Sequence, residues 1–592
     1  MKTIIKRVCC ILVLAVSAGA TNYTVKSGGG GNYTTIQACS NAAVAGDTCT
    51  VFAGSYAGWT QTTSGTSGNP ITFTVNPGDT VYITSSINVT NTSYITIGAP
   101  DSGGGCANNA TATGAGGANP SFNVGGCFVF QNAGVNGPSC GSGNHSNYIH
   151  VSYNTSRGSN PGTLVNFSQG AVTGTGCTPY VNTTSDNNYI GHNNVNWNID
   201  SPSAPFCNYQ ILLYGNNNLV EYNDMQGTGA QHLRMGGSYG ISRGNYFHDD
   251  NGNVTLGCGQ SPEHIDFMFQ EGGDQPALSY SLTERGVFEN CTNDGGNCKF
   301  QFARAGGTSS LDTSQYVIVR YNYIYNIDGS LAGPGSNSDG SNTTPNWAMY
   351  NNTVATMSLN SNSGACGTYA SGIGYQLNTI CYNSQGTDGY SPIDMVTSGS
   401  LTNGDQAFDT GCPSCVWSGG LPTYVDEPTY ARLANQNPNF ANFPTDGTLS
   451  TSSISLGTSS STNSAGPGGV TYTTISSGCG TSSLVVAVSN YFFAGYGPTS
   501  NLPSYASIPV GDVIRVDNNT YQLTAVNYGT NTLTTATPVT CNTGDPVSLY
   551  QLTDGTVVFP LTQTTPDVGA FQSSSSSTSS VLPPTGLTAA VN

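Results

Sequence analysis

Charged and imidazole side chains, the groups that carry acid–base chemistry, gather in one segment of this chain, 221–304. This segment holds 16 of the 44 Asp, Glu, Lys and Arg side chains and three of the six histidines, although it is a small part of the chain. Such a concentration indicates a candidate functional site. Charges that pair with one another on a solvated face would give the same pattern.

Lys299 is the first candidate for chemistry. Beyond residue 20 the chain has only one other lysine, Lys26. A lysine can serve as the general base of an elimination, in which a proton beside a carboxylate is removed, while a second cation or Ca²⁺ stabilises the charge that develops. Arg304 and Arg320 could supply that cation. The predicted ligands for calcium are the acidic side chains that precede Lys299, namely Glu284, Glu289 and Asp294.

A second candidate is the His-x-Asp pair in PEHIDFMFQEGGD, formed by His264 and Asp266. Alternation along a strand would place both side chains on the same face. If that face is the outer one, the two residues could carry acid–base work in hydrolysis or bind a metal ion. If it is the inner one, both would need hydrogen-bond partners in the core. We expect the outer face, so this pair is the alternative to Lys299.

Substrate contacts are predicted at His248, Asp249 and Asp250 in NYFHDDNGN, and at Arg243, Arg285 and Tyr323. The DDNG sequence is also a common solvated turn. The three arginines Arg243, Arg285 and Arg320 occupy similar places near turn residues, so they could equally form a structural ladder on an exterior sheet. Tyr323 alternates with two further tyrosines in RYNYIYN, a pattern that suits either stacking on sugar rings or ordinary packing on a sheet.

The elements that must position these residues are short strands within a repeating sequence motif. The motif consists of an apolar strand, a polar residue, an asparagine and a turn. The motif recurs as NYIHVSYN, NYIGHNNV, NLVEYNDM, YVIVRYNYI and WAMYNNTV. A period of about 21 residues, with alternating apolar side chains and turns at Asn and Gly, predicts a β-solenoid. Glu221 precedes Arg243 by one such period, and Arg243 precedes Arg285 by two. Lys299 and Arg320 are also one period apart, and residues so separated should lie on adjacent rungs.

Residues 21–60 add a resemblance to a known superfamily. The pieces Thr35-Ile36-Gln37-Ala38-Cys39, Gly46-Asp47-Thr48 and Gly54-Ser55-Tyr56 resemble the opening of right-handed parallel β-helix proteins of the pectate-lyase-like superfamily. In that pattern a strand leads into a short helix that caps the open end of the stack. The segment Pro566-Asp567-Val568-Gly569-Ala570-Phe571 resembles the "PDIGAYE" motif with which many bacterial β-helix proteins close.

The predicted organisation is therefore all-β. A signal peptide (1–20) is followed by a right-handed parallel β-helix with an N-terminal helical cap (21–467). A small antiparallel β-domain (468–564) is inserted before a closing strand (565–572), and a Ser-rich linker and tail (573–592) complete the chain. The inserted domain is indicated by alternating residues around turns near Asn518-Asn519 and Gly529-Thr530-Asn531.

The N-terminal segment and the cysteine count predict export from the cell. Lys2, Lys6 and Arg7 precede a short apolar run that ends at Ala18-Gly19-Ala20, the pattern of a secretory signal, and no later run suggests a membrane span. Sixteen of the 18 cysteines remain beyond it, an even number that suits an oxidising compartment, with local pairs expected at Cys39–Cys49, Cys291–Cys298 and Cys479–Cys541. The acidic side chains far outnumber the basic ones, which excludes nucleic acid and anionic membranes as favourable partners.

We therefore expect a secreted or cell-surface monomer that binds or cleaves an extracellular polysaccharide at a groove around 221–304, as a lyase or a glycoside hydrolase. Ca²⁺ is the only cofactor that the residues suggest. The alternative is a non-catalytic structural or adhesion protein in which the solenoid is a rigid spacer, because no complete catalytic signature is present.

Overall fold

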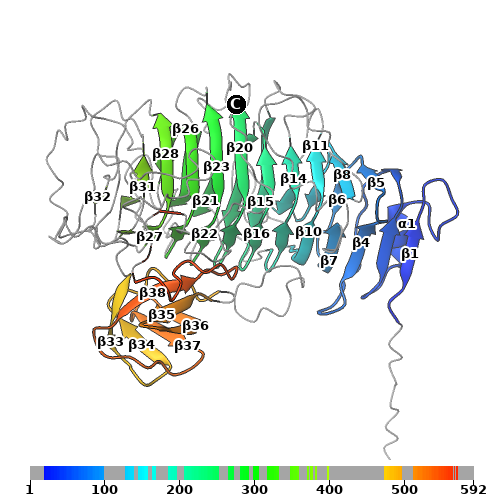
Figure 1. The fold of residues 1–592 in the computed structure, drawn as a ribbon. Coiled ribbons are helices and arrows are strands. Elements are labelled where there is room, and N and C mark those ends of the chain that lie inside the picture. The colour runs from blue at the N-terminus through cyan, green and yellow to red at the C-terminus, as the bar shows by residue number, and fades with distance from the viewer. Residues whose placement is uncertain are drawn as a thin grey trace, which may run out of the picture.

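The computed structural model describes the chain from residue 19 onward, with gaps. The described ranges are 19–98, 127–138, 144–157, 163–167, 185–196, 206–227, 229–251, 265–272, 280–292, 298–305, 316–332, 347–358, 370–371, 374–377, 380–382, 396–398, 472–495, 511–564, 566 and 569–570. Those up to 382, apart from 370–371, wind into a parallel β-helix, and those in 472–564 form a separate barrel beside it (Figure 1).

One long face of the β-helix, sheet A, has 12 strands, all paired in parallel with their neighbours. In spatial order they are β1 (Asn22–Val25), β2 (Thr48–Val51), β4 (Ile71–Val75), β7 (Ser93–Gly98), β10 (Asn147–Ser152), β13 (Tyr189–Gly191), β16 (Leu219–Glu221), β19 (Ile241–Arg243), β22 (Leu282–Glu284), β25 (Ile318–Arg320), β27 (Trp347–Tyr350) and β30 (Gly374–Leu377).

A second, 18-stranded sheet supplies the other two faces, which we name sheets B and C. Sheet B consists of β3 (Gly54–Tyr56), β5 (Thr80–Ile83), β8 (Cys127–Gln131), β11 (Thr155–Arg157), β14 (Asn194–Asn196), β17 (Asp224–Gln226), β20 (Tyr246–Asn251), β23 (Val287–Thr292), β26 (Tyr323–Ala332), β28 (Thr353–Ser358) and β31 (Ile380–Tyr382). Sheet C consists of β6 (Ile87–Asn88), β9 (Val135–Asn136), β12 (Val165–Phe167), β15 (Phe206–Tyr214), β18 (Gly229–Gly236), β21 (Ile265–Gly272), β24 (Cys298–Ala305) and the end of β26. A short pair, β29 (Ala370–Ser371) and β32 (Val396–Ser398), stands apart.

Each of the middle coils thus contributes one strand to sheet A, one to B and one to C. Because side chains alternate along a strand, the middle residue of each short strand points inward. Val220 in β16, Met225 in β17 and Leu233 in β18 show this, since all three belong to one continuous buried core. The flanking residues of the same strands point outward and are the ones available for chemistry. The predicted parallel β-helix is confirmed.

The turn from sheet A to sheet B is held by a ladder of buried asparagines. The side-chain oxygen of Asn193 accepts hydrogen bonds from the backbone and side-chain nitrogens of Asn154, both at 3.1 Å, and Asn223 does the same for Asn193 at 3.0 and 2.9 Å. Asn245 continues the ladder for Asn223, and Asn352 does so for Asn322. Gly286 replaces asparagine on the rung between Asn245 and Asn322. These bonds satisfy buried amides and fix which residues share a column from rung to rung.

The N-terminal end of the stack is capped by helix α1 (Ile36–Ala42). Thr35 begins the helix, and its hydroxyl accepts a hydrogen bond from the Ala38 backbone at 3.2 Å. Ile36 and Cys39 face the first core residues, and Cys39 is bonded to Cys49 of β2. The predicted helical cap and this disulfide are confirmed.

The barrel is closed by six antiparallel strands in the order β33-β34-β37-β36-β35-β38. They are β33 (Thr473–Ser477), β34 (Ser483–Val486), β35 (Val513–Val516), β36 (Asn519–Asn527), β37 (Thr532–Thr535) and β38 (Pro546–Gln551). The predicted antiparallel domain is confirmed, as is the Cys479–Cys541 disulfide. Cys127 and Cys291 each take part in a disulfide as well, and the predicted pairing of Cys291 with Cys298 stays a prediction. No described helix is long and apolar enough to cross a membrane.

Candidate functional site

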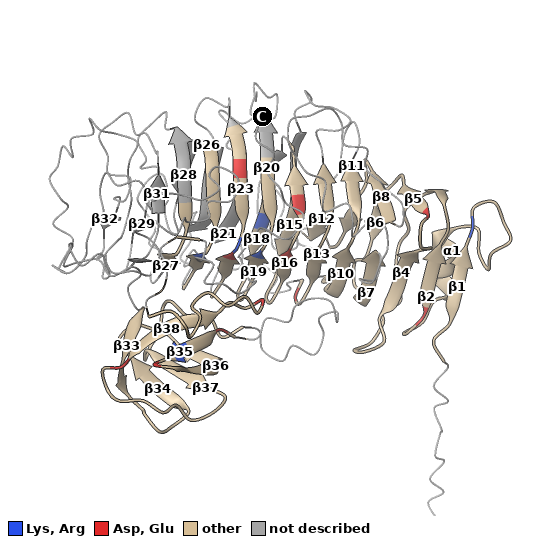
Figure 2. Ribbon diagram, in the orientation of Figure 1, with Lys and Arg blue, Asp and Glu red and all other residues tan. Residues whose placement is uncertain are grey.

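The outer face of sheet A carries a column of polar side chains, one per rung, in the order Glu221, Arg243, Glu284, Arg320 and Tyr350. The register of β16, β19, β22, β25 and β27 pairs each of these residues with the next. In Figure 2 the described strands at the N-terminal end of the sheet, such as β4, β7 and β10, carry no Lys, Arg, Asp or Glu, whereas the middle coils do. Alternating signs on adjacent rungs allow each arginine to pair with the glutamate before it.

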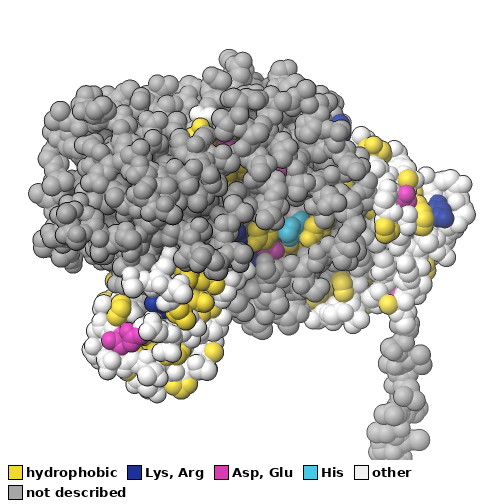
Figure 3. All heavy atoms as spheres, viewed as in Figure 1, with side chains coloured by type: hydrophobic (Ala, Val, Ile, Leu, Met, Phe, Trp, Pro, Cys, Tyr) yellow, Lys and Arg dark blue, Asp and Glu magenta, His cyan; other side chains and the backbone are white. Residues whose placement is uncertain are grey.

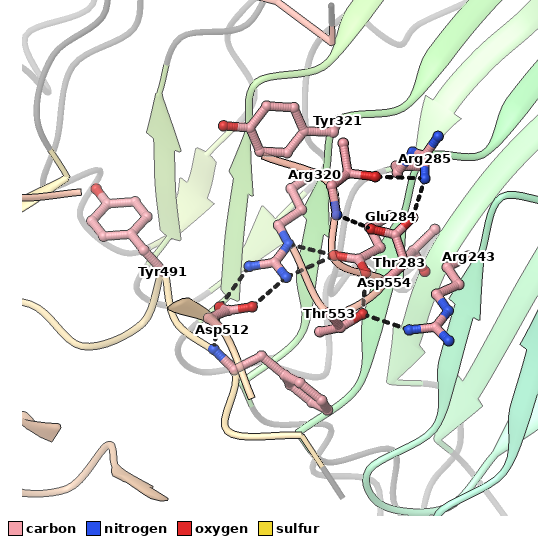
Figure 4. Close-up of polar contacts among 12 residues, drawn as sticks. Arg243, Thr283, Glu284, Arg285, Arg320, Tyr321, Tyr491, Asp512, Thr553 and Asp554 are labelled. Atoms are coloured by element: carbon pink, nitrogen blue, oxygen red, sulfur yellow. Dashed lines mark hydrogen bonds and ion pairs between the residues drawn. The ribbon is translucent and has the colours of Figure 1, made fainter. Parts of the chain in front are cut away.

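Arg320 is the centre of this column and is fully buried. Its guanidinium donates to Glu284 through Nε at 2.9 Å and Nη2 at 2.7 Å. On its other side it donates to both carboxylate oxygens of Asp512, each at 2.7 Å, and to the Tyr350 hydroxyl at 2.9 Å. Asp512 belongs to the barrel, directly before β35, so Arg320 joins the two parts of the protein (Figure 4).

The two other arginines make the same kind of bridge (Figure 4). Arg243 pairs with Glu221 at 2.7 Å and donates to Thr553 of the barrel at 3.1 Å. Arg285 lies in the turn directly after β22, with φ of 56°, and pairs with Asp554. Thr553 also donates to Glu284. Arg243, Arg285 and Arg320, predicted to touch substrate or stabilise charge, are therefore all engaged with the barrel.

Burial sets the ionisation of these carboxyl groups. It raises the pKa of Glu221 and of Glu284 above the ordinary value, while Arg243 and Arg320 respectively pull it back down. Burial would also raise the pKa of Asp554, but Arg285 and Arg243, with the Thr556 backbone N–H, outweigh it and lower that pKa to about 2. Asp554 is thus held as a carboxylate by its two arginines.

Apolar and aromatic contacts complete the attachment of the barrel. A second outward column of sheet A belongs to one buried cluster with the barrel core, and its members are Tyr189, Leu219, Ile241, Leu282, Ile318 and Ala348. Tyr528 of the barrel stacks on Tyr316 at 4.4 Å and on Tyr280 at 5.5 Å. In Figure 3 yellow hydrophobic side chains of the barrel gather where it meets the β-helix. Sheet A in these coils is therefore an internal interface.

The expected spacing of rungs needs correction. Arg243 was expected to align with Arg285, two coils later. In the structure Arg243 aligns with Glu284, the residue before Arg285, and the two strands that carry Arg243 and Glu284 are on adjacent coils. Lys299 and Arg320 were expected on adjacent rungs, yet Lys299 lies in sheet C opposite Ser330 while Arg320 lies in sheet A. The hydrogen-bonded ladder fixes the rungs, and loops of unequal length between the sheets break the period. Glu221 and Arg243 do align as expected.

A different polar cluster lies on the outer face of sheet B, formed by Asp224, Tyr246, His248 and Glu289. The register pairs Asp224 with Tyr246 and His248 with Glu289. Phe247, between Tyr246 and His248, points into the core, so its two neighbours point outward.

The contacts within this cluster link acid and base groups. His248 Nε2 lies 2.7 Å from Asp224 Oδ1, and the imidazole stacks on the Tyr246 ring with centroids 3.8 Å apart. The Tyr246 hydroxyl donates to Glu289. All four side chains are buried, and His248 is 1% exposed. A carboxylate that accepts from an imidazole fixes its tautomer and orientation, the arrangement of an acid–base pair.

Aromatic and amide side chains extend this cluster along sheet B. Tyr323 follows Val287 on the next rung and stacks on Tyr325 at 6.2 Å, and burial together with Glu289 raises the pKa of Tyr325. On the preceding rung the amide of Asn194 donates to Asp224 at 3.5 Å. Asp249 and Asp250 lie further along β20. His248 and Glu289 were predicted separately, whereas Asp224 and Tyr246 were missed.

The remaining predicted residues fall on or beside sheet C. Asp266 of β21 and Lys299 of β24 are direct partners in the register, and Glu271 is the partner of Arg304. Gln231 of β18 precedes Asp266 in the same column. His264 and Asp294 lie outside the described residues. Lys299, the predicted base of an elimination, and Asp266, the aspartate of the alternative His264–Asp266 pair, therefore lie in one column of sheet C. Sheet C follows sheet B in each coil.

The predicted calcium ligands are divided between two sheets. Glu284 is on sheet A, with its oxygens engaged by Arg320 and Thr553, and Glu289 is on sheet B. Among the residues that the structure describes, no three His, Cys, Asp or Glu side chains form a group that could hold a metal ion. Glu284 and Glu289 therefore do not face one common site.

Comparison with known proteins gives remote likenesses. No family model matches the chain, and no curated protein matches its sequence. Among solved structures, the PL6 family alginate lyase AlyGC gives a TM-score of 0.35 at 13% identity, covering 65% of this chain and 51% of the lyase. The pectate lyase Pel9A gives 0.32 at 12% identity, covering 74% of this chain and 92% of that one. The protein XylC in complex with xylose gives 0.29 at 9% identity, covering 65% and 83%. The chain thus spans about half the length of AlyGC.

Proposed function

We propose that this protein binds or cleaves an extracellular polysaccharide, with the sheet B cluster of Asp224, Tyr246, His248 and Glu289 as its acid–base group. The observation that carries the proposal is the His248–Asp224 pair at 2.7 Å with Tyr246 stacked on the imidazole. Glycosidic bonds are broken by elimination or hydrolysis, and both routes need a base and an acid that flank the bond to be broken. Parallel rungs supply such a pair at the spacing of one coil.

The roles follow from the contacts. Asp224 accepts a hydrogen bond from His248 Nε2 and orients the imidazole, so the other ring nitrogen of His248 is the group able to take a proton. The Tyr246 hydroxyl, bonded to Glu289, is the group able to give one. Lys299, which lies opposite Asp266 in the register of sheet C, would supply the cationic contact that a uronic acid requires. Arg320 has no part in this scheme because its partners are Glu284 and Asp512.

One observation favours the second candidate, a non-catalytic extracellular spacer or adhesion protein. The four cluster residues are buried and bonded to one another, which is also how a structural polar network behaves. The disulfides Cys39–Cys49 and Cys479–Cys541 suit the extracellular setting of either function.

The test uses the purified mature protein with a panel of polyuronates and neutral glycans, with Ca²⁺ or with a chelator. Unsaturated products are followed by ultraviolet absorbance and new reducing ends by a reducing-sugar assay. On a glycan that is cleaved, His248→Gln should lower kcat by about 10²–10⁴-fold, since that is the usual contribution of one proton-transfer group. The matched control is Lys26→Ala, which removes a cation from the N-terminal cap.

The same panel decides between the candidates. Cleavage that His248→Gln leaves unchanged would refute the assigned site, and Lys299→Ala with unchanged activity would remove the lysine from it. If no glycan is cleaved and none binds, the spacer function is favoured.

A further inference from the structure

Asn194 lies beside Asp224 on the outer face of sheet B, one rung before it. The register pairs these two residues, and it pairs Asp224 in turn with Tyr246, so the three occupy one column. Val195, the middle residue of β14, belongs to the buried core, which sends the Asn194 side chain outward. Asn194 and Asp224 are each 5% exposed. Asn194 is therefore a direct neighbour of the proposed acid–base group.

The Asp224 carboxylate is held between two side chains. Its Oδ1 lies 2.7 Å from His248 Nε2, and its Oδ2 accepts from Asn194 Nδ2 at 3.5 Å. Because a carboxylate accepts hydrogen bonds and donates none, the NH₂ end of the Asn194 amide must be the end that faces it. The two donors stand on the rungs before and after Asp224, so together they fix the direction in which the carboxylate points.

The other end of the Asn194 amide has no partner. Within the described part of the chain, its Oδ1 is buried and accepts no hydrogen bond. Thr155, the neighbour on the preceding rung, places its hydroxyl 3.9 Å from the sulfur of Cys127 instead. A buried acceptor without a donor opposes folding, and the one bond to Asp224 is long and therefore weak. The Asn194 side chain thus adds little to stability, or lowers it.

The fold does not require an amide at this position. The backbone N–H of Asn194 donates to the Asn154 carbonyl at 2.8 Å, so the main chain holds its rung in place. The same column contains a buried apolar residue, Val287, two rungs after Asp224. An apolar side chain at position 194 would therefore suit the column, and it would remove the unpaired acceptor. A residue that opposes folding and is nevertheless present indicates a functional role.

The amide supplies a donor to the charge that proton transfer uses. When His248 takes a proton, the resulting imidazolium faces Asp224, which must stay in place as a carboxylate. A donor on the second oxygen keeps that carboxylate from turning away. Hydrogen bonds of this kind are often long before substrate binds and shorten in the transition state, so the distance of 3.5 Å is compatible with such a role.

We propose that Asn194 is a positioning residue of the acid–base group, which orients Asp224 against His248 without touching the substrate. This inference rests on the proposed function of that group. It gives Asn194 a part in proton transfer and no part in the stability of the β-helix. Activity and stability should therefore respond differently to its replacement.

The test compares Asn194→Leu with a matched control, Asn196→Leu, in the full mature chain. Asn196 points outward from the same strand and is also 5% exposed, but its amide donates to Gln226. On a glycan that is cleaved, Asn194→Leu should lower kcat by about 10–10²-fold with KM unchanged, because misplacing a reacting group by about 1 Å costs about 10²-fold. Its urea midpoint should stay the same or rise. Asn196→Leu should lower the urea midpoint and leave kcat unchanged.

A second measurement needs no substrate. In a chain with isotope-labelled histidine, NMR of the ring nitrogens of His248, assigned with His248→Gln, reports which nitrogen carries the proton. The unaltered chain should show the single neutral tautomer with its proton on Nε2, because Asp224 accepts from that atom. Asn194→Leu should give a mixture of the two tautomers, and Asn196→Leu should give the spectrum of the unaltered chain.

Failure of this inference and failure of the proposed function are distinguishable. If no glycan is cleaved, or if His248→Gln leaves cleavage unchanged, the proposed function is wrong, and the tautomer of His248 still shows whether Asn194 orients Asp224. If His248→Gln lowers kcat and Asn194→Leu does not, the positioning role alone is wrong.

Three further results would overturn the inference. A raised KM at unchanged kcat in Asn194→Leu would show direct contact with the substrate. A lowered urea midpoint at unchanged kcat would show a purely structural residue. An unchanged tautomer of His248 in Asn194→Leu would show that the amide does not hold Asp224 in place.

Discussion

Removal of the Arg320 side chain should detach the barrel from the β-helix more effectively than any other single truncation of a cation. Arg320→Ala deletes five hydrogen bonds, of which two go to Glu284, two to Asp512 and one to Tyr350. It leaves two buried carboxylates without their shared cation. Breaking a buried pair in this way costs about 3–5 kcal/mol.

The measurement is urea unfolding followed by circular dichroism, with limited proteolysis to report release of the barrel. The midpoint should move to lower urea, and proteolysis between the two parts should become faster. Lys26→Ala is the matched control. Its cation lies 4.2 Å from the centre of the Phe52 ring, so its removal should cost about 1 kcal/mol or less.

A second variant separates loss of attraction from unpaired charge. In Arg320→Met combined with Glu284→Gln and Asp512→Asn, neither carboxylate that faced Arg320 remains, and most of the lost stability should return. If Arg320→Ala costs no more than Lys26→Ala, the buried network contributes nothing to docking and the reasoning is refuted.

Two further outcomes are expected from the same contacts. The pKa of Asp554 is lowered to about 2 from its ordinary 3.8, so its contribution to stability is present above pH 4 and is lost as the pH falls toward 2. The free energy of unfolding should drop by about 2 kcal/mol over that interval. Asp554→Asn should remove that part of the pH dependence. Asn223→Ala removes one member of the buried asparagine ladder and leaves the backbone N–H and one side-chain N–H of Asn193 without their acceptor, which should cost about 2–3 kcal/mol in urea unfolding. A cost below about 0.5 kcal/mol, the usual scatter of surface changes, would show that the ladder is dispensable.

The fold was predictable from the sequence because its signals are local. Alternating strands and turn asparagines such as Asn223 and Asn245 are visible within one short stretch of chain, and the helix over Ile36–Ala42 begins at the recognisable cap Thr35. The inserted barrel was likewise visible in the alternation and turns of β35, β36 and β37. Each of these features needs only neighbours in sequence.

The partners of the arginines could not be predicted because they are distant in sequence. Asp512 follows Arg320 by 192 residues and Asp554 follows Arg285 by 269, and nothing near either arginine points to the barrel. The alternative prediction for Arg320, a structural ladder of arginines on sheet A, agrees with its contacts to Glu284 and Asp512 better than a catalytic role does.

The sheet B cluster, in contrast, could have been predicted from the sequence. Asp224 and Tyr246 each follow a turn asparagine directly, so aligning the coils on Asn223 and Asn245 places Asp224 beside Tyr246 and brings His248 within one rung of Asp224. Counting from the turn asparagine, rather than by a fixed period, recovers the column.

The barrel meets the β-helix through residues that are very far apart along the chain, and this constrains how the protein folds. The hydroxyl of Tyr222 donates to Asp554, 332 residues later, and Arg243 reaches Thr553 across 310. During synthesis the coils around β16 and β19 emerge long before β38, so they must stack while their charged column still faces water. Contacts of such long range raise the contact order and slow the final step of folding, in which the barrel closes over sheet A.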